Sequence, residues 1–554
     1  MEARIKGNFV CLIGAGDSGK STILSAIEYA LTPKWNQGFD DSDFYNQDID
    51  QAIVIEVTLF DWEESVDIRK FFSESKFGQF ICGLNDSGPI PEPEEGSINA
   101  ITVQLIVDKS LEPHWSLIKG TESKMISAND RLLFGLGRID NHSDANFTWS
   151  RNSSLSKLTS GNFENMTELL STIARTAKNS EITLEGCTSV ANDIRTESRR
   201  LGVSLDEIKP KIDIQKFSLA SGALSLHEDQ IPLRNFGSGS KKLISCAIQF
   251  KLNSGKNLTL IDELETGLEP HRIRGLIKNL KITGQQVIAS THSPVVLREL
   301  TVSENELYVC QKKPDGIVVL KSAREVPSIQ AAIRSNAEAF LTKKIVVCEG
   351  PTEIGCLRAI DEFKAQSSTP VWTLSTAYFN AAGIGNVKSV ALKLKELGYD
   401  VIVFCDNDTP DQFPLATVDE LSRSNIQTVY WEQGKSIEIQ LFAEIAWRCL
   451  PNLLEIVAKS KESSRSSLIS SIRSKITLLS ESVDDWEDTP DLRLKLGNLA
   501  AGKTISGEID HSANAWFKRI DQSEAVFKYA ITQLENSSTF MNRLNTIWSW
   551  IQDA

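Results

Sequence analysis

The feature that most constrains the fold is a glycine-rich segment near the start of the chain. Residues 14–21 read Gly-Ala-Gly-Asp-Ser-Gly-Lys-Ser and match the pattern G-x-x-x-x-G-K-S/T. An apolar stretch, FVCLI, precedes this segment, and an amphipathic stretch, STILSAIEYAL, follows it. A strand, a glycine loop and a helix in this order form a phosphate-binding loop, which belongs to α/β folds. The segment therefore predicts an α/β domain that binds a nucleotide.

Each residue type in this loop suits contact with phosphate. Gly14, Gly16 and Gly19 allow backbone N–H groups to close around phosphate oxygens. Lys20 is expected to neutralise the β- and γ-phosphates, and the Ser21 hydroxyl to hold Mg²⁺. The N-terminus of the following helix adds a favourable dipole. The nucleotide contacts expected from the same loop also include Asp17, Ser18 and Thr22.

Two later strands end in residues that would complete a nucleotide site. The run NLTLI ends in Asp262 and Glu263. We expect Asp262 to reach the Mg²⁺ shell and Glu263 to polarise the attacking water, whereas the structural alternative is a capping pair after a core strand. His292 follows the apolar strand 285–291 and could contact a γ-phosphate, although a single His is more often structural.

A glycine-serine turn opens another apolar helix. The segment Phe236-Gly-Ser-Gly-Ser-Lys-Lys242 precedes LISCAIQF. Ser238, Gly239 and Ser240 would offer N–H donors at a helix N-terminus, where they can cap a phosphate of a nucleotide bound to another subunit.

The order of these motifs resembles the ABC-type heads of the SMC and recombination-repair ATPases. The resemblance implies that two heads sandwich two ATP molecules, each loop being completed by Ser238–Ser240 of the partner. Two departures stand out. The loop begins at residue 14, so either the start is truncated or the sheet edge is built differently. The segment ETGLEPH lacks a His that is often found before its Leu, which implies slow turnover.

The second half of the chain holds a set of acidic residues at strand ends. The strand KIVVC runs into Glu349 and, four residues later, Glu353; the strand VIVFC runs into Asp406 and Asp408. Residues two apart on an extended chain share a face, so both aspartates can point to one place. Several carboxylates at one sheet edge repel unless divalent cations lie among them, and oxygen ligands favour Mg²⁺ or Mn²⁺. The alternative is two unrelated, solvated acidic clusters.

This arrangement of Glu-Gly-x-x-Glu and Asp-x-Asp resembles the TOPRIM domain of topoisomerases, primases and OLD-type nucleases. Glu438 lies in a segment similar to one that bears a further family carboxylate, or it is only a first-turn acid after an N-cap serine. The resemblance also implies a cation for the transition state; Lys518 is the first candidate and Lys503 the second, against a surface lysine. Glu349, Glu353, Asp406 and Asp408 would then be both catalytic residues and metal ligands.

An ABC-type ATPase followed by TOPRIM resembles the OLD (overcoming lysogenisation defect) family, over roughly residues 8–60, 230–320 and 335–440. The resemblance implies an ATP-regulated, metal-dependent DNA endonuclease or nickase with ATP and Mg²⁺ or Mn²⁺ as cofactors. It also implies a role in antiphage defence, as in Gabija nuclease subunits and retron effectors. Expected partners are DNA, a second copy in a dimer or tetramer, and a helicase or a reverse transcriptase with its RNA and DNA.

The expected fold is α/β: an ABC-type P-loop ATPase head with an inserted helical arm, then a TOPRIM domain with helical C-terminal additions. The helical spacing of Met166, Leu169, Leu170 and Ile173 indicates the arm. Residues 84–97 are expected to form a proline-rich acidic loop, and residues 128–165 are polar and show no clear period. Strands are expected at 52–60, 101–107, 115–118, 257–262, 285–291, 306–310 and 316–320, and helices at 441–480 and over the last 40 residues. The expected domains are an N-terminal ATPase lobe (1–150), a helical insertion for dimerisation (151–215), a C-terminal ATPase lobe (216–330) and TOPRIM (335–554).

Composition excludes several classes. A net charge of −14 excludes a uniformly basic nucleic-acid coat. The nine cysteines have no C-x-x-C spacing, which favours buried, reduced thiols in a cytoplasmic protein over a zinc site. No apolar run is long enough for a membrane helix.

Two other functions remain open. One is an ATP-dependent DNA tether with an inactive TOPRIM. The other is a topoisomerase or primase, although a topoisomerase needs a nucleophilic Tyr and the last 110 residues hold only Tyr529.

Overall fold

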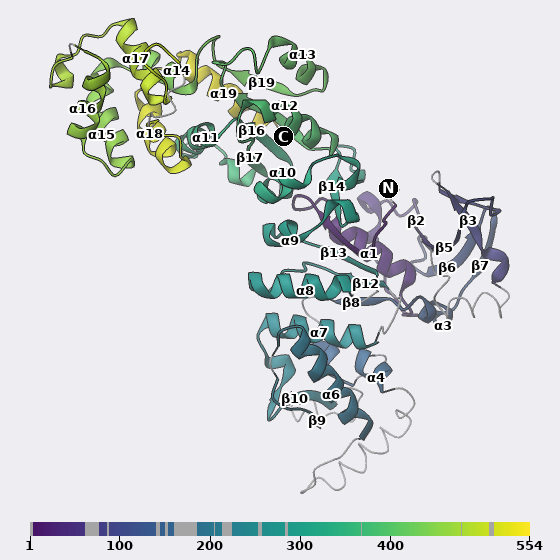
Figure 1. Cartoon of the computed structure of the whole chain (residues 1–554). Helices are drawn as coiled ribbons and strands as arrows, with labels where there is room; N and C mark the ends of the chain where they lie inside the picture. Colours follow the sequence, from purple (N-terminus) through teal and green to yellow (C-terminus); the bar gives the residue numbers. More distant parts are fainter. Residues whose placement is uncertain are drawn as a thin grey trace. The chain divides into compact units, whose positions relative to one another are not determined.

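The computed structural model divides the 554-residue chain into two compact units, each described below by itself (Figure 1). One unit contains residues 1–13 and 17–319; the other contains the three loop residues 14–16 and residues 320–554. This division falls before the boundary expected at 330–335. The described residues are 4–60, 77–85, 88–139, 144–149, 153–159, 185–203, 205–212, 224–252, 258–282, 286–366, 368–477, 479–508 and 515–553.

The first unit is built on a six-stranded sheet of order β15-β14-β1-β13-β12-β8. β1 pairs in parallel with β13 and β14, and β12 pairs in parallel with β13 and β8. Because parallel strands end at the same edge, the residues after β1, β12 and β13 meet there. These are the glycine loop, the Asp262–Glu263 pair and His292. The strands are β1 (Phe9–Ile13), β8 (Gly137–Ile139), β12 (Leu258–Ile261), β13 (Gln286–Ser290), β14 (Leu307–Lys312) and β15 (Val318–Ser322).

Four helices of this unit come directly before or after the strands that carry the site. They are α1 (Lys20–Leu31), α7 (Ser238–Leu252), α8 (Pro270–Ile282) and α9 (Pro294–Glu299), of which α7, α8 and α9 follow one another in Figure 1. In α8 the buried residues are Ile273, Leu276, Ile277 and Leu280. Their spacing of three and four places one apolar stripe against the protein and leaves the opposite face to solvent.

A second, antiparallel sheet confirms the expected strands at 52–60, 101–107 and 115–118. It contains β2 (Ile53–Phe60), β3 (Cys82–Asn85), β4 (Gly88–Ile90), β5 (Ile98–Val107), β6 (Pro113–Lys119) and β7 (Glu122–Met125). The loop expected at 84–97 is wrong in part, because β3 and β4 pair there. The proline-rich composition concealed a short strand that packs tightly. A Cβ at Gly83 would lie 2.8 Å from Ile90 Cγ1.

The insertion expected at 151–215 is not wholly helical. It contains α4 (Ser154–Leu158) and α6 (Glu185–Arg200), then β9 (Ile208–Ile212). β9 pairs antiparallel with β10 (Leu224–Glu228), next to β11 (Ile231–Pro232). Pro210 lacks the N–H that a helix interior needs, which disfavours a helix there. Met166, Leu169, Leu170 and Ile173 lie outside the described residues.

The segment 128–165, which showed no period, also contains structure. α3 (Ala128–Arg131) lies in it, and β8 joins the main sheet at its edge beside β12. β8 has only three residues, which is too short for a periodic pattern.

The second unit has a parallel sheet of order β17-β16-β18-β19. Its β16 and β18 are the two strands expected from KIVVC and VIVFC, and Cys348 pairs with Phe404 at their ends. The strands are β16 (Lys344–Cys348), β17 (Thr376–Asn380), β18 (Asp400–Cys405) and β19 (Gln427–Tyr430); the helices between them are α11 (Pro351–Lys364), α12 (Ile384–Glu396) and α13 (Leu415–Arg423).

Six helices after β19 confirm the expected helical C-terminal part. They are α14 (Ile437–Glu444), α15 (Leu450–Ser460), α16 (Arg465–Lys475), α17 (Pro490–Ala500), α18 (Ile520–Gln533) and α19 (Thr539–Gln552). α18 approaches α11 closely: a Cβ at Gly355 would lie 2.5 Å from Ser523 Cβ, and Ser523 Oγ donates to the Thr352 carbonyl at 2.6 Å. This contact fixes the chain just after Lys518 against the start of α11.

All nine cysteines are buried and free, as the sequence predicted. Among the residues that the structure describes, no helix is both long and apolar enough to span a bilayer.

Candidate functional site

The glycine loop joins β1 to α1 through backbone angles that favour glycine. Gly14 has φ 142° and Gly19 has φ 91°. A Cβ at Gly19 would also lie 2.8 Å from Val318 Cγ2, so space and conformation both disfavour a larger residue. α1 begins at Lys20, directly after this turn. The free N–H groups of its first turn can therefore meet an anion.

Two basic side chains from different elements, Lys20 and His292, influence each other at this loop. Lys20 is 4% exposed, and its Nζ donates to Ser18 Oγ at 3.1 Å. Burial lowers the pKa of Lys20. Burial, and then the charge of Lys20, lower the pKa of His292. A phosphate group between them would favour the charged form of both side chains.

Asp262 is held in place by three neighbouring groups. Ser21 Oγ donates to Asp262 Oδ1 at 3.2 Å, and Ser290 Oγ donates to the same oxygen. Arg138 Nη2 lies 3.4 Å from Asp262 Oδ2, and its Nη1 lies 3.6 Å from Glu28 Oε2. A hydroxyl and a carboxylate oxygen thus lie side by side at the mouth of the loop, which is a donor set that suits Mg²⁺.

Glu263 follows Asp262 in a strained turn. Its φ of 46° is positive, and its Oε2 accepts a hydrogen bond from Thr266 Oγ1 at 2.9 Å. Lys242 Nζ donates to the carbonyl oxygens of Asp262 and Glu263, at 2.9 and 3.3 Å. These contacts fix the end of β12 and aim its two acids.

Glu265 supports the His292 segment. Thr291 Oγ1 donates to Glu265 Oε2, and the His292 N–H donates to Oε1, both at 2.7 Å. Sequence reasoning missed Glu265, Lys242 and Arg138. The signals were weak: Glu265 lies three residues after Asp262, Lys242 is a basic residue opening an apolar helix, and Arg138 lies in the very short β8.

The glycine-serine turn forms the start of α7 in close contact with the loop after β12. A Cβ at Gly239 would lie 2.3 Å from the Gly267 carbonyl oxygen, and one at Gly267, where φ is 74°, would lie 2.4 Å from Ser238 Oγ. Ser238 is exposed and Ser240 is half-buried. Elsewhere in the loop Gly16, Asp17 and Thr22 are exposed.

The acidic residues of the second unit gather after β16 and β18. Glu349 follows β16, and its Oε2 accepts the Asp406 N–H at 3.2 Å. Asp406 follows β18, and its Oδ1 accepts the Ile437 N–H at 2.8 Å, so Asp406 caps α14. Glu353 lies in the first turn of α11, where its Oε2 accepts the Gly350 N–H at 2.8 Å. Backbone donors thus orient three carboxylates.

Glu438 and Lys518 form an ion pair inside this group. Glu438 is fully buried in the first turn of α14, after the N-cap Ser436, and its Oε1 lies 2.6 Å from Lys518 Nζ. Burial opposes the charge of Lys518, but Glu438, Asp406 and Glu353 outweigh it and raise the pKa of Lys518. The five side chains Glu349, Glu353, Asp406, Glu438 and Lys518 are called the acid cluster below.

Burial is the main influence on the protonation of the acid cluster. It raises the pKa of Glu353 to about 8, with Glu349 as the next cause. It also raises the pKa of Glu349 and takes that of Asp406 well above its usual range. For Glu438 burial acts in the same direction, but Lys518 outweighs it and the pKa is lowered. Lys518 thus lowers the pKa of all four carboxylates, but only for Glu438 does its charge outweigh burial.

Asp408 and Asp406 have different partners. β18 ends at Cys405, so both aspartates lie beyond the strand and do not share a strand face as expected. Asp408 Oδ2 accepts a hydrogen bond from Lys503 Nζ at 2.6 Å. Its charge still contributes to the raised pKa of Glu349, so it lies at the border of the acid cluster. Lys503 and Lys518, the two lysines considered as the transition-state cation, thus each contact a carboxylate that was expected to be a metal ligand.

The donors suit a hard divalent cation, although they are not yet arranged around one. Within the described part of the chain, no three His, Cys, Asp or Glu side chains are in ligating geometry. Both Glu438 carboxylate oxygens are buried without a well-directed hydrogen bond from any described residue. Oxygen donors with unsatisfied lone pairs fit Mg²⁺ or Mn²⁺, once Lys518 and Lys503 yield part of their contacts.

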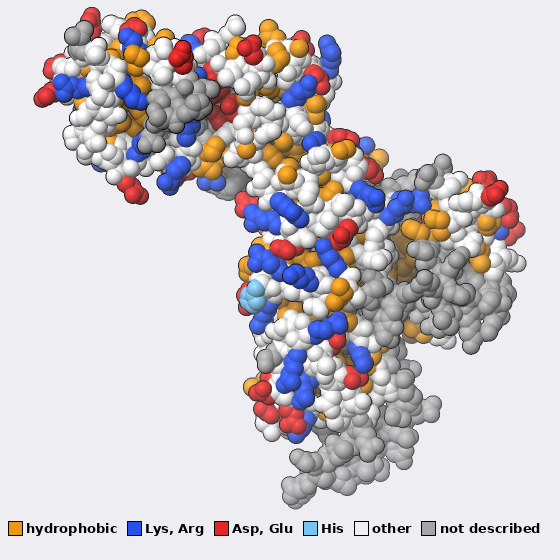
Figure 2. Space-filling view, viewed as in Figure 1, with side chains coloured by type: hydrophobic (Ala, Val, Ile, Leu, Met, Phe, Trp, Pro, Cys, Tyr) orange, Lys and Arg blue, Asp and Glu red, His pale blue; other side chains and the backbone are white. Residues whose placement is uncertain are grey.

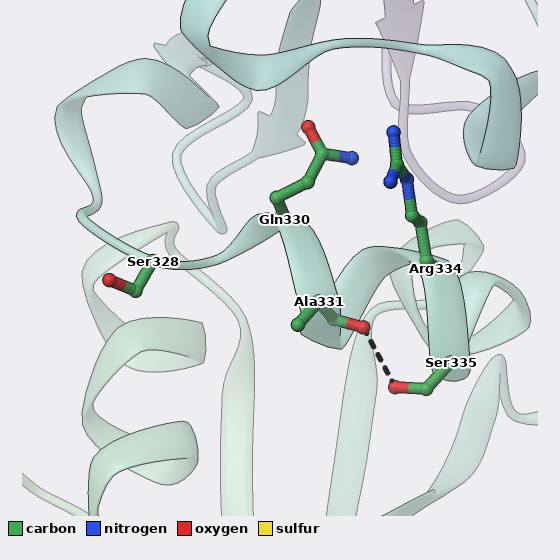
Figure 3. Close-up of a pocket in the computed structure, with 5 residues that line it drawn as sticks. All are labelled: Ser328, Gln330, Ala331, Arg334 and Ser335. Atoms are coloured by element: carbon green, nitrogen blue, oxygen red, sulfur yellow. Dashed lines mark hydrogen bonds between the residues drawn. The ribbon is translucent and has the colours of Figure 1, made fainter.

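A shallow pocket of about 660 Å³ on the second unit is lined by different residues (Figure 3). Ser328, Gln330, Ala331, Arg334 and Ser335 line it, on and before α10 (Gln330–Ser335). Ser335 Oγ donates to the Ala331 carbonyl at 2.9 Å. None of the residues expected to be functional lies in this pocket.

Comparison with known proteins relates the first unit to ATPases. Residues 128–298 match a family described as "AAA domain, putative AbiEii toxin, Type IV TA system". This range includes Asp262, Glu263 and His292, whereas the glycine loop precedes it. No curated protein matches the chain.

Solved structures similar to the chain include ATPase heads. The Smc head domain of Pyrococcus furiosus, bound to the C-terminal domain of ScpA, is 12% identical; the match covers 60% of this chain and 94% of that one, with a TM-score of 0.35. The SMC head domain from Thermotoga maritima is 13% identical over 58% and 92%, with a TM-score of 0.27. The ABC transporter component CbiO1 from Clostridium perfringens is 13% identical over 61% and 86%, with a TM-score of 0.27.

The first unit therefore has an α/β fold with a phosphate-binding loop before α1, and residues 128–298 match an AAA-domain family model. This fold implies ATP as its ligand, with Mg²⁺. Lys20, Ser21 and Asp262 are the residues of this chain that fit the phosphate and the metal.

Proposed function

We propose that this chain is an ATP-regulated, divalent-metal-dependent DNA endonuclease or nickase. The observation that carries the proposal is the acid cluster. Four carboxylates from β16, α11, β18 and α14 gather around Lys518 at the carboxyl ends of parallel strands, where open α/β sheets bind ligands. Burying this much negative charge is costly, and a function that needs divalent cations accounts for it.

Glu349, Glu353, Asp406 and Asp408 would hold the cation, with Glu438 as a further ligand. A bound Mg²⁺ or Mn²⁺ activates water and stabilises the leaving oxygen of a phosphodiester. The backbone N–H groups at Asp406, Gly350 and Ile437 orient the carboxylates before a substrate arrives. Oriented donors avoid reorganisation during the reaction.

Lys518 and Lys503 are the two cations available to the reacting phosphate. Lys518 pairs with the fully buried Glu438 although its own side chain is 44% exposed, and Lys503, which is 16% exposed, contacts Asp408 at the border of the acid cluster. We assign Lys518 to stabilisation of the transition-state charge, because three of the acids act on it together. Lys503 is then the cation that orients Asp408.

The ATPase domain would control the nuclease rather than drive its chemistry. Glu263 would position the attacking water and His292 would contact the γ-phosphate. The exposed Ser238 at the start of α7 suits contact with a nucleotide bound to a second copy, which supports self-association through the heads. In the cell, the OLD-like motif order supports an antiphage role with a helicase or reverse-transcriptase partner.

Cleavage of supercoiled plasmid tests this function. Purified protein is incubated with Mg²⁺ or Mn²⁺, with and without ATP or ADP, and nicked and linear products are quantified. We expect metal-dependent products whose rate changes with the nucleotide. Equal rates under all nucleotide conditions would contradict the regulation, and no products with either metal would contradict the nuclease.

One observation favours a second candidate, an ATP-dependent DNA tether. In the described residues the acids are held by lysines and backbone donors rather than in ligating geometry. A tether would bind DNA in an ATP-dependent manner and yield no products in the same assay.

A further inference from the structure

The ATPase domain carries a positively charged helix that the proposed chemistry does not use. α8 contains four basic residues and no acidic residue, in a chain whose net charge is −14. Its apolar stripe is buried, and of the basic residues Arg274 and Lys278 are exposed whereas the other two are half-buried. These four residues are Arg272, Arg274, Lys278 and Lys281.

The exposed cations of α8 continue onto α9. Lys278 follows Arg274 by one turn on the same side of α8. Arg274 Nε lies 3.0 Å from Oε1 of Glu299, the last residue of α9, next to Arg298. Figure 2 shows Lys and Arg side chains gathered over α8 and α9. We call Arg274, Lys278 and Arg298 the basic face.

Part of this charge is not neutralised by the protein. Arg272 pairs with Glu269, Arg274 with Glu299 and Lys281 with Glu306. Lys278 and Arg298 are exposed, and within the described ranges neither makes a hydrogen bond or an ion pair. Two free cations beside partly neutralised ones form a surface that attracts a polyanion.

We propose that the basic face binds the phosphate backbone of duplex DNA without reading its sequence. α8 has 13 residues and is about 20 Å long, which suffices to follow several phosphates of one strand. Flexible lysine and arginine side chains on a convex helix contact phosphates and do not need a groove. The choice of DNA as the polyanion rests on the proposed function, whereas the surface uses none of the acid cluster.

Binding of a labelled DNA duplex in EDTA, followed by fluorescence anisotropy at several salt concentrations, tests the proposal without cleavage. The variant is Lys278→Ala combined with Arg298→Ala. We expect its Kd to rise at least about tenfold and the slope of log K against log salt to fall by about two, one for each phosphate contact. Its melting temperature and ATP hydrolysis should match those of the wild type.

The control removes equal charge elsewhere, with Lys459→Ala combined with Lys495→Ala. Lys459 is exposed and Lys495 is half-buried, and each lies four residues after an acid with which it pairs. Equal effects of the two double variants would overturn the proposal, because only net charge would then matter. An unchanged Kd and salt slope in the first variant would also overturn it.

A third arm titrates poly-glutamate in place of DNA. If the double variant loses poly-glutamate binding and keeps DNA binding, the surface serves an acidic protein and the proposal is wrong. Failure of the nuclease has a different signature, since the wild type would then bind DNA and yield no products with Mg²⁺ or Mn²⁺.

Discussion

The nucleotide site and the acid cluster bury charges of opposite sign. At the glycine loop the perturbed groups are cations, because burial lowers the pKa of Lys20 and of His292. In the acid cluster they are carboxylates, because burial raises the pKa of Glu353 and of Asp406. A bound anion would stabilise the charged forms of Lys20 and His292, and a bound cation would stabilise the charged forms of the carboxylates. This difference supports the proposal of a phosphate ligand for the first site and a divalent metal for the second.

The two sites also hold their acids differently. Asp262 contacts the hydroxyls of Ser21 and Ser290, which can rotate to accommodate a metal. Asp406 is bound by a backbone N–H at the start of α14, which cannot rotate. The first site can adapt to successive nucleotide states, whereas the second is built to keep one geometry.

The largest effect should come from Asp406→Asn. The variant keeps the shape of the side chain but removes a charged ligand, so we expect plasmid cleavage to slow at least about a thousandfold, about 4 kcal/mol in activation free energy. Asp361→Asn is the matched control, since Asp361 is a buried acid of α11 that bonds to Tyr378. Comparable cleavage by both variants would remove Asp406 from the site.

Lys518→Met should reduce stability as well as cleavage. It leaves Glu438 buried without its cation, which should lower the free energy of unfolding by less than about 3 kcal/mol, the cost of breaking a fully buried pair, because the Lys518 side chain is 44% exposed. Adding Glu438→Gln should restore most of that stability, as measured by urea denaturation, but not cleavage. Recovery of cleavage in the double variant would show that Lys518 is only structural.

Lys20→Ala should weaken ATP binding about a hundredfold, close to 2.7 kcal/mol, through loss of the cation beside the phosphates. Lys34→Ala serves as the control, because Lys34 lies just after α1 and its side chain is mostly exposed. Titration calorimetry measures both variants. Equal affinities for ATP would contradict the assignment of the glycine loop.

The smallest expected effect concerns pH. Burial raises the pKa of Asp361 to about 7, although Tyr378 and Arg358 act in the opposite direction. Because the folded protein favours the protonated form, this contribution to stability is complete below the unfolded pKa of about 3.9 and is lost as the pH rises through 7. Between pH 5 and 8 the loss should be about 2 kcal/mol.

Asp361→Asn isolates this contribution. Chemical denaturation at several pH values should show a flatter stability profile for the variant than for the wild type. Parallel profiles would contradict the raised pKa of Asp361.

Much of the fold followed from local patterns in the sequence. The strands at 257–262 and 285–291 and the two strands before the acids were recognisable because parallel, buried strands are continuous apolar runs. β8 and β4 were missed because three residues cannot show a period. β9 was taken as helix although Pro210 argues against it.

Of the site residues, the sequence could predict those that directly follow a strand. Residues directly after β1 and β12 could be grouped, and so could those after β16 and β18, because the parallel strands of each sheet end at one edge. Arg138 and Glu265 could not, since they act through contacts with Asp262 and His292 that depend on tertiary packing. The strand face that Asp406 and Asp408 were expected to share is absent because β18 ends one residue before Asp406.

Binding of Mn²⁺ to the nucleotide-free protein tests the central claim most directly. Titration calorimetry of the wild type, Asp406→Asn and Asp361→Asn compares the acid cluster with a buried acid outside it. The account predicts that the wild type and Asp361→Asn bind Mn²⁺ and that Asp406→Asn has lost this binding. Equal binding by all three proteins, or none by the wild type, would contradict it.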